Sequence, residues 1–205
     1  KYKKELFDDR ETVFHQRVIY DELLAHQFFF RGNYHLNKTY KSKPINYSKS
    51  IHENFLNNLE FKLTNQQILV FQEIKKDLNN IYPMNRLLQG DVGSGKTVVA
   101  TMAALQVIGN GYQVAFMAPT EILAEQHYEK LSTWLSKIGI NVELLIGSMN
   151  NKLKTEVNKK IIDGEANLIV GTHALIQEKV KFKFIGFYII DEQHRFGVKQ
   201  RLTLR

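Results

Sequence analysis

The sequence predicts an α/β fold with a mainly parallel sheet and helices on both of its faces. From Phe61 onward, short apolar runs alternate with longer segments of helical periodicity. Strands separated by helices favour parallel crossover connections. A glycine-rich segment, Gly90–Thr97, also stands between an apolar run and a run rich in Ala and Val. Such a segment is typical of the turn from a strand into a helix in folds of this class.

The composition is that of an ordinary soluble globular protein. The chain has 205 residues, of which 43% are hydrophobic and 24% are charged, and it contains no cysteine. Disulfides and thiolate metal sites are therefore excluded, which agrees with a reducing compartment. No apolar stretch reaches the length of a membrane span, so we expect a cytoplasmic protein without a membrane partner. The net charge of +7 favours polyanionic partners such as nucleic acid or nucleotide.

The first 60 residues differ from the rest of the chain. Apolar residues recur at helical spacing through Glu11–Phe30, which predicts an amphipathic helix that Gly32 and Asn33 end. A polar, basic stretch follows and is expected to be a connector or an exposed loop. A short helix is expected at Ile51–Leu59. We therefore interpret residues 1–60 as a helical connector in front of the α/β domain.

The α/β domain is expected to begin with a helix that runs to Leu78. Thr64 precedes this helix and Gln67 stands three residues later, which is the spacing of a capping box. The remaining elements follow from the lengths and periodicities of the apolar runs. The expected strands are Arg86–Gln89, Gln113–Ala118, Asn141–Ile146, Asn167–Val170 and Phe187–Ile190. The expected helices are Gly95–Gly109, Glu121–Ile138, Asn150–Gly164 and a shorter one near His173–Gln177.

The glycine-rich segment GDVGSGKT fits the phosphate-binding pattern G-x-x-x-x-G-K-[ST] at every fixed position. Its glycines let the backbone turn so that N–H groups point inward, and the helix that follows offers its positive end to anionic phosphates. Lys96 is expected to reach the β- and γ-phosphates of a nucleotide, and Thr97 to offer its hydroxyl to Mg²⁺. The expected nucleotide-binding residues of this segment are Gly90, Asp91, Val92, Gly93, Ser94, Gly95, Lys96 and Thr97.

A pair of carboxylates follows the last expected strand. Phe187–Ile190 runs directly into Asp191 and Glu192. Because ligands lie at the carboxyl ends of parallel strands, Asp191 is expected to bind the same Mg²⁺ and Glu192 to orient or deprotonate an attacking water. His194, just beyond them, is expected to join the catalytic groups by sensing the γ-phosphate, although a polar cap at the end of the strand is the alternative.

Four motifs occur in an order that resembles a known family. They are GDVGSGKT, MAPTEILAEQH (117–127), VGTHALIQ (170–177) and IIDEQHRFGV (189–198). Together they resemble the first RecA-like motor domain of superfamily 2 helicases, and specifically the RecG family of ATP-dependent DNA helicases. The resemblance implies a RecA-like P-loop fold that uses ATP and Mg²⁺. It also implies action on branched DNA, such as stalled replication forks and Holliday junctions, in fork rescue and recombinational repair.

The resemblance also implies roles for residues outside the phosphate-binding loop. Gln67 matches a glutamine that contacts adenine in the family, and this role is compatible with its place in the capping box. Two further groups match motifs that face DNA, although Thr120 and Thr172 also suit helix N-caps. These expected DNA-binding residues are Pro119, Thr120, Glu121, Gly171, Thr172 and His173.

The domain plan of the resembled family predicts what this chain contains. RecG-family proteins have a wedge domain that grips branched DNA, followed by two motor domains. We interpret residues 1–60 as the connector from the wedge, and 61–205 as a first motor domain that stops before its end. The second motor domain, which supplies arginines to the γ-phosphate, is absent, so we expect this fragment to be nearly inactive alone. The alternatives are a DNA translocase of the transcription-repair coupling type and a P-loop switch that does not act on nucleic acid.

Overall fold

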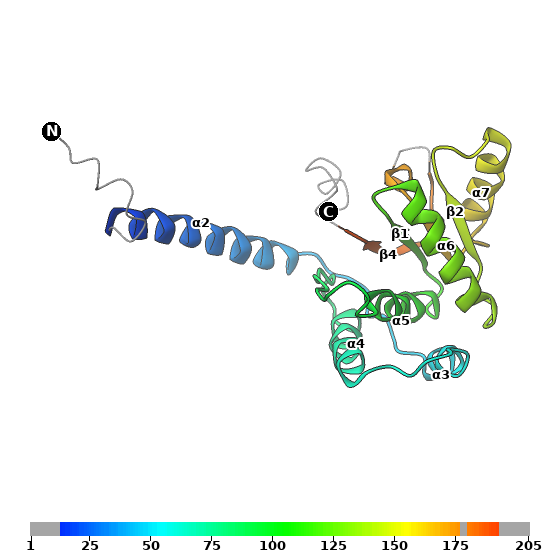
Figure 1. Cartoon of the computed structure of the whole chain (residues 1–205), viewed down its shortest axis with the longest axis horizontal. Coiled ribbons are helices and arrows are strands. Elements are labelled where there is room, and N and C mark those ends of the chain that lie inside the picture. Colours follow the sequence, from blue (N-terminus) through cyan, green and yellow to red (C-terminus); the bar gives the residue numbers. More distant parts are fainter. Residues whose placement is uncertain (1–12, 177–179, 193–205) are drawn as a thin grey trace. The chain divides into compact units, whose positions relative to one another are not determined.

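The computed structural model describes residues 13–176 and 180–192 (Figure 1). The described residues form two compact units. Unit 1 holds the residues up to Lys43 together with Asn80–Met84, and unit 2 holds Pro44–Asn79 and the residues from Asn85 onward. Among the described residues, no helix combines the length and the apolar character that a membrane crossing requires.

Unit 1 contains one long helix, α2 (Val13–Asn37). The sequence predicted that Gly32 and Asn33 end this helix, and that prediction is wrong, because the helix continues to Asn37. A glycine inside a helix costs only about 1 kcal/mol relative to alanine, so it does not by itself end one. Most of the large apolar side chains of α2 that the structure describes are exposed. They include Phe14, Val18, Ile19, Leu23, Phe28 and Phe29.

Unit 2 contains the predicted α/β elements together with residues 44–60, which were expected to belong to the connector, and it is built on a four-stranded sheet. The strand order is β2-β3-β1-β4, and every pair of neighbouring strands is parallel. The strands are β1 (Gln113–Met117), β2 (Val142–Leu145), β3 (Leu168–Gly171) and β4 (Ile185–Ile190). The helices are α3 (Lys49–Asn57), α4 (Asn65–Leu78), α5 (Lys96–Ile108), α6 (Glu121–Ser136), α7 (Asn151–Asp163) and the short 3₁₀ helix η1 (His173–Ile176).

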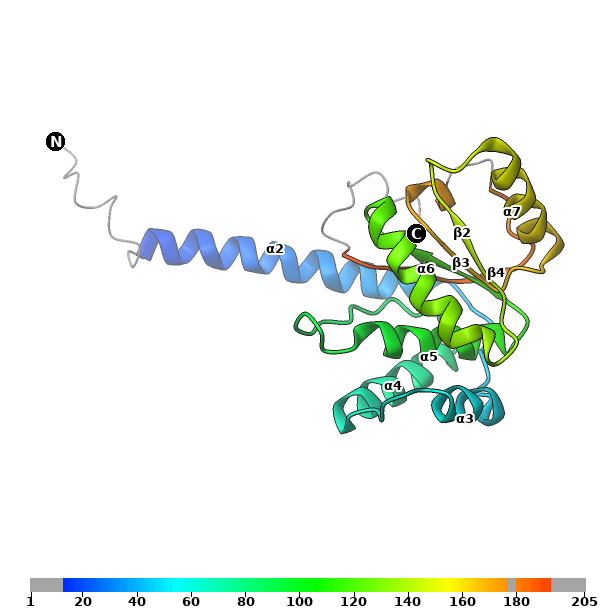
Figure 2. The same cartoon turned by 45° about the vertical axis from the view of Figure 1, so that its right-hand side comes forward.

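Helices cover both faces of this sheet, as the sequence predicted. Successive side chains of a strand point to opposite faces. In β1, Ala115 and Met117 belong to a buried apolar cluster that includes Val157 and Ile161 of α7. Phe116 points to the other face, where its ring lies 4.7 Å from the ring of His127 on α6. Figure 2 shows α6 and α7 separated by the strands.

Gln113 anchors the first residue of β1 to segments that follow much later in the chain. Its side chain is buried, and its Nε2 donates hydrogen bonds to the carbonyl oxygens of Ile161 and Ala166. Its Oε1 accepts hydrogen bonds from the backbone amides of Lys183 and Phe184. One amide side chain therefore bonds to four backbone groups, of which the carbonyl oxygen of Ile161 also accepts from the Gly164 amide.

The predicted strand at Arg86–Gln89 does not form. This segment has no ladder partner among the described residues, where β4 pairs with β1 alone. Without a neighbouring strand, extended backbone has no ladder hydrogen bonds to stabilise it. The segment is held instead through its first side chain. Arg86 pairs with Glu73 at 2.6 Å and with Asp77 at 2.7 Å, both on α4.

Candidate nucleotide-binding site

The glycine-rich loop leads directly into α5. Gly93 and Gly95 have φ values of 80° and 81°, in the left-handed region that favours glycine. Gly95 is the N-cap, and α5 begins at Lys96. The Nζ atom of Lys96 donates hydrogen bonds to the carbonyl oxygens of Gly90 at 2.7 Å and Asp91 at 2.8 Å. The lysine therefore lies over the loop, in the position from which a bound phosphate could recruit it.

Gln67 connects this loop to the start of α4. Its Oε1 accepts a hydrogen bond from the Thr64 backbone amide at 2.9 Å, and the backbone amide of Gln67 donates to Thr64 Oγ1 at 3.2 Å. This is the predicted capping box. Its Nε2 also donates to the carbonyl oxygen of Ser94 at 2.9 Å. A Cβ atom at Gly95 would collide with that amide group, so the contact requires glycine at this position.

Asp191 lies at the end of β4, where its backbone amide donates to the carbonyl oxygen of Met117 at 2.8 Å. Its Oδ2 atom is 2.8 Å from Nε2 of His127, and its Oδ1 accepts from the Glu192 amide at 3.0 Å. The hydrogen bond from His127 is the main cause that lowers the pKa of Asp191, and partial burial opposes it. The positive charge of Lys96 makes a smaller contribution that also lowers this pKa.

Glu192 follows with a backbone φ of 52°, in the left-handed region. For a residue other than glycine, this conformation costs about 1–3 kcal/mol, and such residues cluster at functional sites. The side chain of Glu192 is exposed at the end of the strand. The third expected catalytic group, His194, lies outside the described residues.

His127 contacts Asp191 at the candidate site, and it is a residue that sequence reasoning missed. It stands within one of the motifs quoted above, but no role was assigned to it. A signal was present in the spacing, because Ala124, His127, Leu131 and Leu135 recur at helical intervals, and the three apolar members of that series are buried. A histidine on the buried face of a helix needs a polar partner, and here Asp191 is that partner.

The segment Pro119–Glu121 connects β1 to α6. Thr120 is the N-cap of α6, and its hydroxyl accepts a hydrogen bond from the Leu123 amide at 3.3 Å. The carboxylate of Glu121 accepts a hydrogen bond from the Ser148 amide at 3.0 Å. Hydrogen bonding from Ser148 is the main cause that lowers the pKa of Glu121, and the charge of Lys154 contributes to it. Glu121 is therefore engaged with the loop that leads from β2 to α7.

The segment Gly171–His173 connects the last residue of β3 to the start of η1. A Cβ atom at Gly171 would collide with the carbonyl oxygen of Leu145 on β2, so glycine permits the close approach of these two strands. Thr172 is buried, and its carbonyl oxygen accepts from the Leu175 amide at the start of η1. His173 is exposed. Of these three residues, His173 has the side chain that is most accessible to a ligand.

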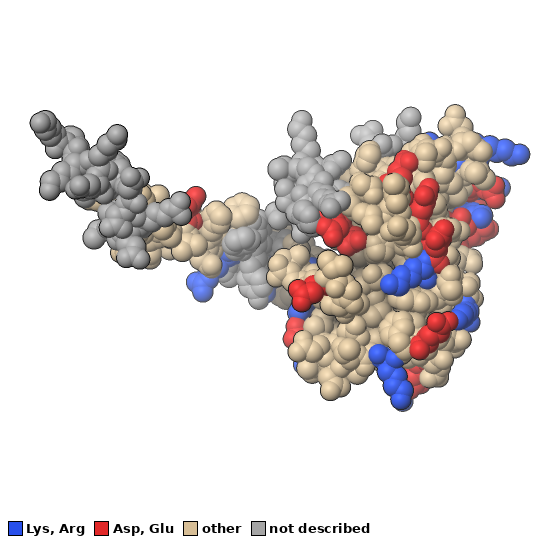
Figure 3. All heavy atoms as spheres, viewed as in Figure 1, with Lys and Arg blue, Asp and Glu red and all other residues tan. Residues whose placement is uncertain are grey.

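Parallel pairing brings these segments to one edge of the sheet. Asp191 follows β4, Pro119 follows β1 and Thr172 follows β3, so all three lie at carboxyl ends of parallel strands. This edge is where ligands bind in open α/β sheets. Over unit 2, on the face shown in Figure 3, the described basic and acidic side chains are interspersed, with no single basic patch on that face.

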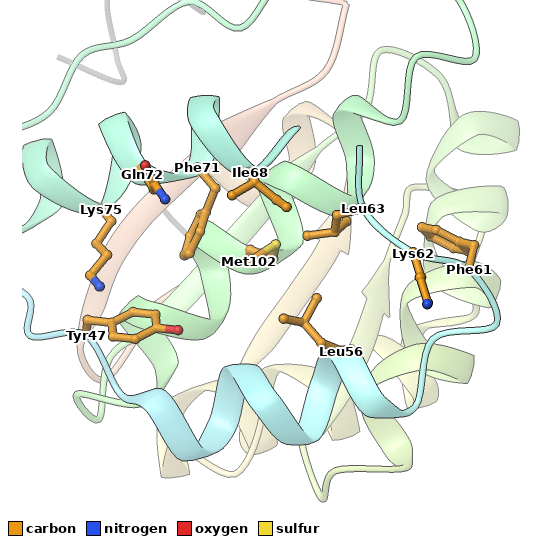
Figure 4. Close-up of a pocket in the computed structure, with 10 residues that line it drawn as sticks. All are labelled: Tyr47, Leu56, Phe61, Lys62, Leu63, Ile68, Phe71, Gln72, Lys75 and Met102. Atoms are coloured by element: carbon orange, nitrogen blue, oxygen red, sulfur yellow. The ribbon is translucent and has the colours of Figure 1, made fainter. Parts of the chain in front are cut away.

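A separate cavity of about 510 Å³ lies between α3 and α4, with Met102 of α5 behind it (Figure 4). Its walls are mainly apolar, and the Nζ atom of Lys75 lies 3.6 Å from the centre of the Tyr47 ring at one end. None of the expected site residues lines this cavity. The phosphate-binding loop and the end of β4 are therefore the candidate site.

Fold and site together define a P-loop ATPase domain of the helicase type. The family model for DEAD/DEAH box helicases matches residues 64–204, and the chain belongs to this family. Nucleotide use, and ATP in particular, is a property of that family.

Within the family, the chain is similar to RecG helicases over almost its whole length. It is 50% identical over 192 residues to the ATP-dependent DNA helicase RecG of Aquifex aeolicus, covering 94% of this chain and 24% of that protein. It is 47% identical over 190 residues to RecG of Pasteurella multocida, covering 93% of this chain and 27% of that protein. These relatives confirm the resemblance predicted from the sequence.

A solved structure gives the same result for the fold. A structure of RecG bound to a three-way DNA junction superposes on this chain with a TM-score of 0.81 at 44% identity, and covers 91% of this chain and 26% of that one. The RecA-like fold class predicted from the sequence is thereby confirmed. The chain spans about a quarter of the length of these relatives.

Proposed function

We propose that this chain is the first motor domain of an ATP-dependent DNA helicase that acts on branched DNA. The observation that carries the proposal is the phosphate-binding loop, where Gly95 caps α5 and Nζ of Lys96 bonds to the carbonyl oxygens of Gly90 and Asp91. Asp191 lies at the carboxyl end of β4, and ligands bind at such ends in open α/β sheets. The similarity to RecG relatives, including one described as bound to a three-way DNA junction, supports DNA as the second ligand.

In this proposal the loop residues 90–97 bind the phosphates of ATP. Backbone N–H groups of the loop and the positive end of α5 hold the anionic oxygens. Lys96 leaves the carbonyl oxygens of Gly90 and Asp91 to bind the β- and γ-phosphates. In this proposal Gln67, whose Nε2 donates to the carbonyl oxygen of Ser94, contacts the adenine of ATP.

Thr97 and Asp191 fit a magnesium ion that arrives with the nucleotide. Mg²⁺ prefers oxygen ligands and usually binds through one or two protein groups together with phosphates and water. When bound, Mg²⁺ neutralises charge on the transferred phosphoryl group. Glu192 then orients or deprotonates the attacking water.

DNA contact is proposed at the carboxyl edge of the sheet, through Pro119–Glu121 and Gly171–His173. The contacts are mainly to phosphates, because helix starts and hydroxyl groups bind phosphate oxygens without reading sequence. Binding should therefore be independent of sequence and sensitive to salt. We further propose that residues 1–60 connect this domain to a wedge domain, and that a second motor domain completes the ATPase site.

The decisive experiment compares the complete gene product with this 205-residue chain. ATP hydrolysis is measured with Mg²⁺ in the presence and absence of a synthetic three-way junction. The complete product should hydrolyse ATP and be stimulated by the junction. This chain alone should be slower by about 10³–10⁵-fold, the usual contribution of arginines supplied from a partner domain. A rate of ATP hydrolysis that does not change when the junction is added would instead favour a nucleotide switch.

A further inference from the structure

His127 makes a contact that the general chemistry of P-loop enzymes does not require. Its Nε2 atom lies 2.8 Å from Oδ2 of Asp191, the carboxylate proposed to bind magnesium. An ionised carboxylate only accepts hydrogen bonds, so Nε2 carries the proton and donates it. The two side chains are 15% and 31% exposed, so water competes weakly for this bond.

The position of the His127 ring is set by its packing. The ring stacks against Phe116 of β1, with 4.7 Å between the ring centres and 47° between the ring planes. β1 and β4 are neighbouring strands, and the Asp191 amide donates to Met117, the residue after Phe116. The imidazole of His127 therefore packs against Phe116 on β1 and at the same time contacts the Asp191 carboxylate at the end of the neighbouring strand β4.

The Asp191 carboxylate is in turn held at both of its oxygen atoms. Oδ2 accepts from His127, and Oδ1 accepts from the Glu192 amide at 3.0 Å. A carboxylate offers about four lone-pair positions, so each oxygen keeps one for a further ligand. The two hydrogen bonds fix the plane of the carboxylate and so decide where those remaining positions point.

We propose that His127 is a positioning residue for Asp191, holding this carboxylate in the orientation that binds the metal of a magnesium–nucleotide complex. The inference rests on the proposed function of the site. It assigns to α6 a task at the nucleotide site, while the N-cap of the same helix, Thr120, belongs to the proposed DNA contact about 10 Å along the helix axis. Groups that orient metal ligands in this way commonly contribute about 10- to 100-fold to metal affinity.

The test uses the complete gene product and measures Mn²⁺ binding by electron paramagnetic resonance in the presence of ADP. His127→Leu keeps an apolar group against Phe116 but removes the donor, and it should weaken Mn²⁺ binding by about 10- to 100-fold. His127→Gln places an amide donor near the position of Nε2 and should recover most of the affinity. Glu125→Ala, on the exposed face of α6, should bind Mn²⁺ like the wild type.

The affinity for ADP without metal separates positioning from a general structural effect. It should be the same in the wild type and in both His127 variants, because His127 touches Asp191 and not the phosphate-binding loop. ATP hydrolysis by His127→Leu should need a correspondingly higher Mg²⁺ concentration for half-maximal rate. A leucine variant that binds Mn²⁺–ADP as tightly as the wild type would overturn the proposal.

Failure of this proposal is distinguishable from failure of the proposed function. If the wild type neither binds Mn²⁺–ADP nor hydrolyses ATP, the ATPase assignment is wrong. If it does both and His127→Leu is unchanged, only the role of His127 is wrong. If the leucine variant does not fold, the proposal is tested in the wild-type protein by the NMR resonance of the His127 Nε2–H proton. This resonance should persist when Mg²⁺ and ADP bind, and its disappearance would overturn the positioning role.

Discussion

His127 Nε2 lies 2.8 Å from Asp191 Oδ2, so α6 and the end of β4 are joined by one hydrogen bond between residues 64 positions apart. The bond lowers the pKa of Asp191 and so opposes the partial burial that would raise it. An ionised carboxylate is the form that a metal requires. The carboxyl end of β4 thus holds an acidic group whose two oxygen atoms are fixed by hydrogen bonds.

Lys96→Ala should abolish ATP hydrolysis by the complete gene product. The change removes the side chain proposed to stabilise the β- and γ-phosphates, and loss of one such charged contact lowers kcat by about 10²–10³-fold or more. Among the described residues, Lys96 bonds only to loop carbonyls that water can satisfy, so the melting temperature should hardly change. Lys152→Ala, an exposed position on α7, is the control. Junction-stimulated hydrolysis by the Lys96 variant would contradict the assignment.

Gln113→Ala should destabilise unit 2 strongly. The substitution leaves the carbonyl oxygen of Ala166 and the backbone amides of Lys183 and Phe184 without the Gln113 partner, while the carbonyl oxygen of Ile161 keeps its bond from the Gly164 amide. Each unpaired buried group costs about 1–3 kcal/mol, although water entering the space offsets part of this loss. We expect a loss of roughly 3 kcal/mol or more in the free energy of unfolding, measured by urea titration with circular dichroism. Gln126→Ala, at an exposed position on α6, should change stability by less than about 0.5 kcal/mol.

Gly171→Ala should also destabilise the sheet, because the new methyl group would meet the carbonyl oxygen of Leu145. β2 and β3 must then separate, and overpacking of this kind costs about 1–3 kcal/mol. The matched control is Gly32→Ala in α2, where an added Cβ meets nothing within 4 Å. That change should raise helix stability by about 1 kcal/mol. Equal effects of the two substitutions on thermal unfolding would refute the packing role of Gly171.

The buried His52 should make unit 2 less stable in mild acid. Its ring nitrogens lie 2.7 Å from the carbonyl oxygen of Ser48 and 2.9 Å from that of Met102. Burial lowers the pKa of His52 below its usual value of 6.5, although the two carbonyls oppose this shift and the charge of Lys75 adds to it. His52 therefore binds a proton less readily in the folded state than in the unfolded chain. Its contribution to the free energy of unfolding is complete above about pH 6.5 and decreases as the pH falls below that value.

The measurement for His52 is urea unfolding between pH 8 and pH 5, compared with His52→Gln. The glutamine variant should be less stable at pH 8, because it loses the packing of the imidazole ring against the rings of Tyr47 and Phe71. Its stability should decrease less on acidification, since the titrating group is gone. The remaining histidines are common to both proteins and cancel in the comparison. Parallel pH profiles for the two proteins would contradict the prediction.

Much of the fold was predictable because its signals are local. The capping box of Thr64 and Gln67, the start of α6 after Thr120 and the four observed strands all follow from short patterns in the chain. The phosphate-binding segment was also readable, since its glycines and Lys96 are specified by backbone geometry and charge within eight residues. Two predictions were wrong, namely the helix end at Gly32 and the strand at Arg86–Gln89. In both cases a local preference was not sufficient, because the outcome depended on partners that are distant in the sequence or absent.

By itself, then, the sequence determined most of the elements, the parallel class of the sheet and the candidate groups for nucleotide binding. Only the tertiary structure decided which of those groups meet. The order β2-β3-β1-β4 places β4 beside β1, and this pairing brings Asp191 to the histidine that α6 presents over Phe116. No local pattern encodes a hydrogen bond between residues 64 positions apart, because it forms only when the sheet and the helix that covers it have packed together.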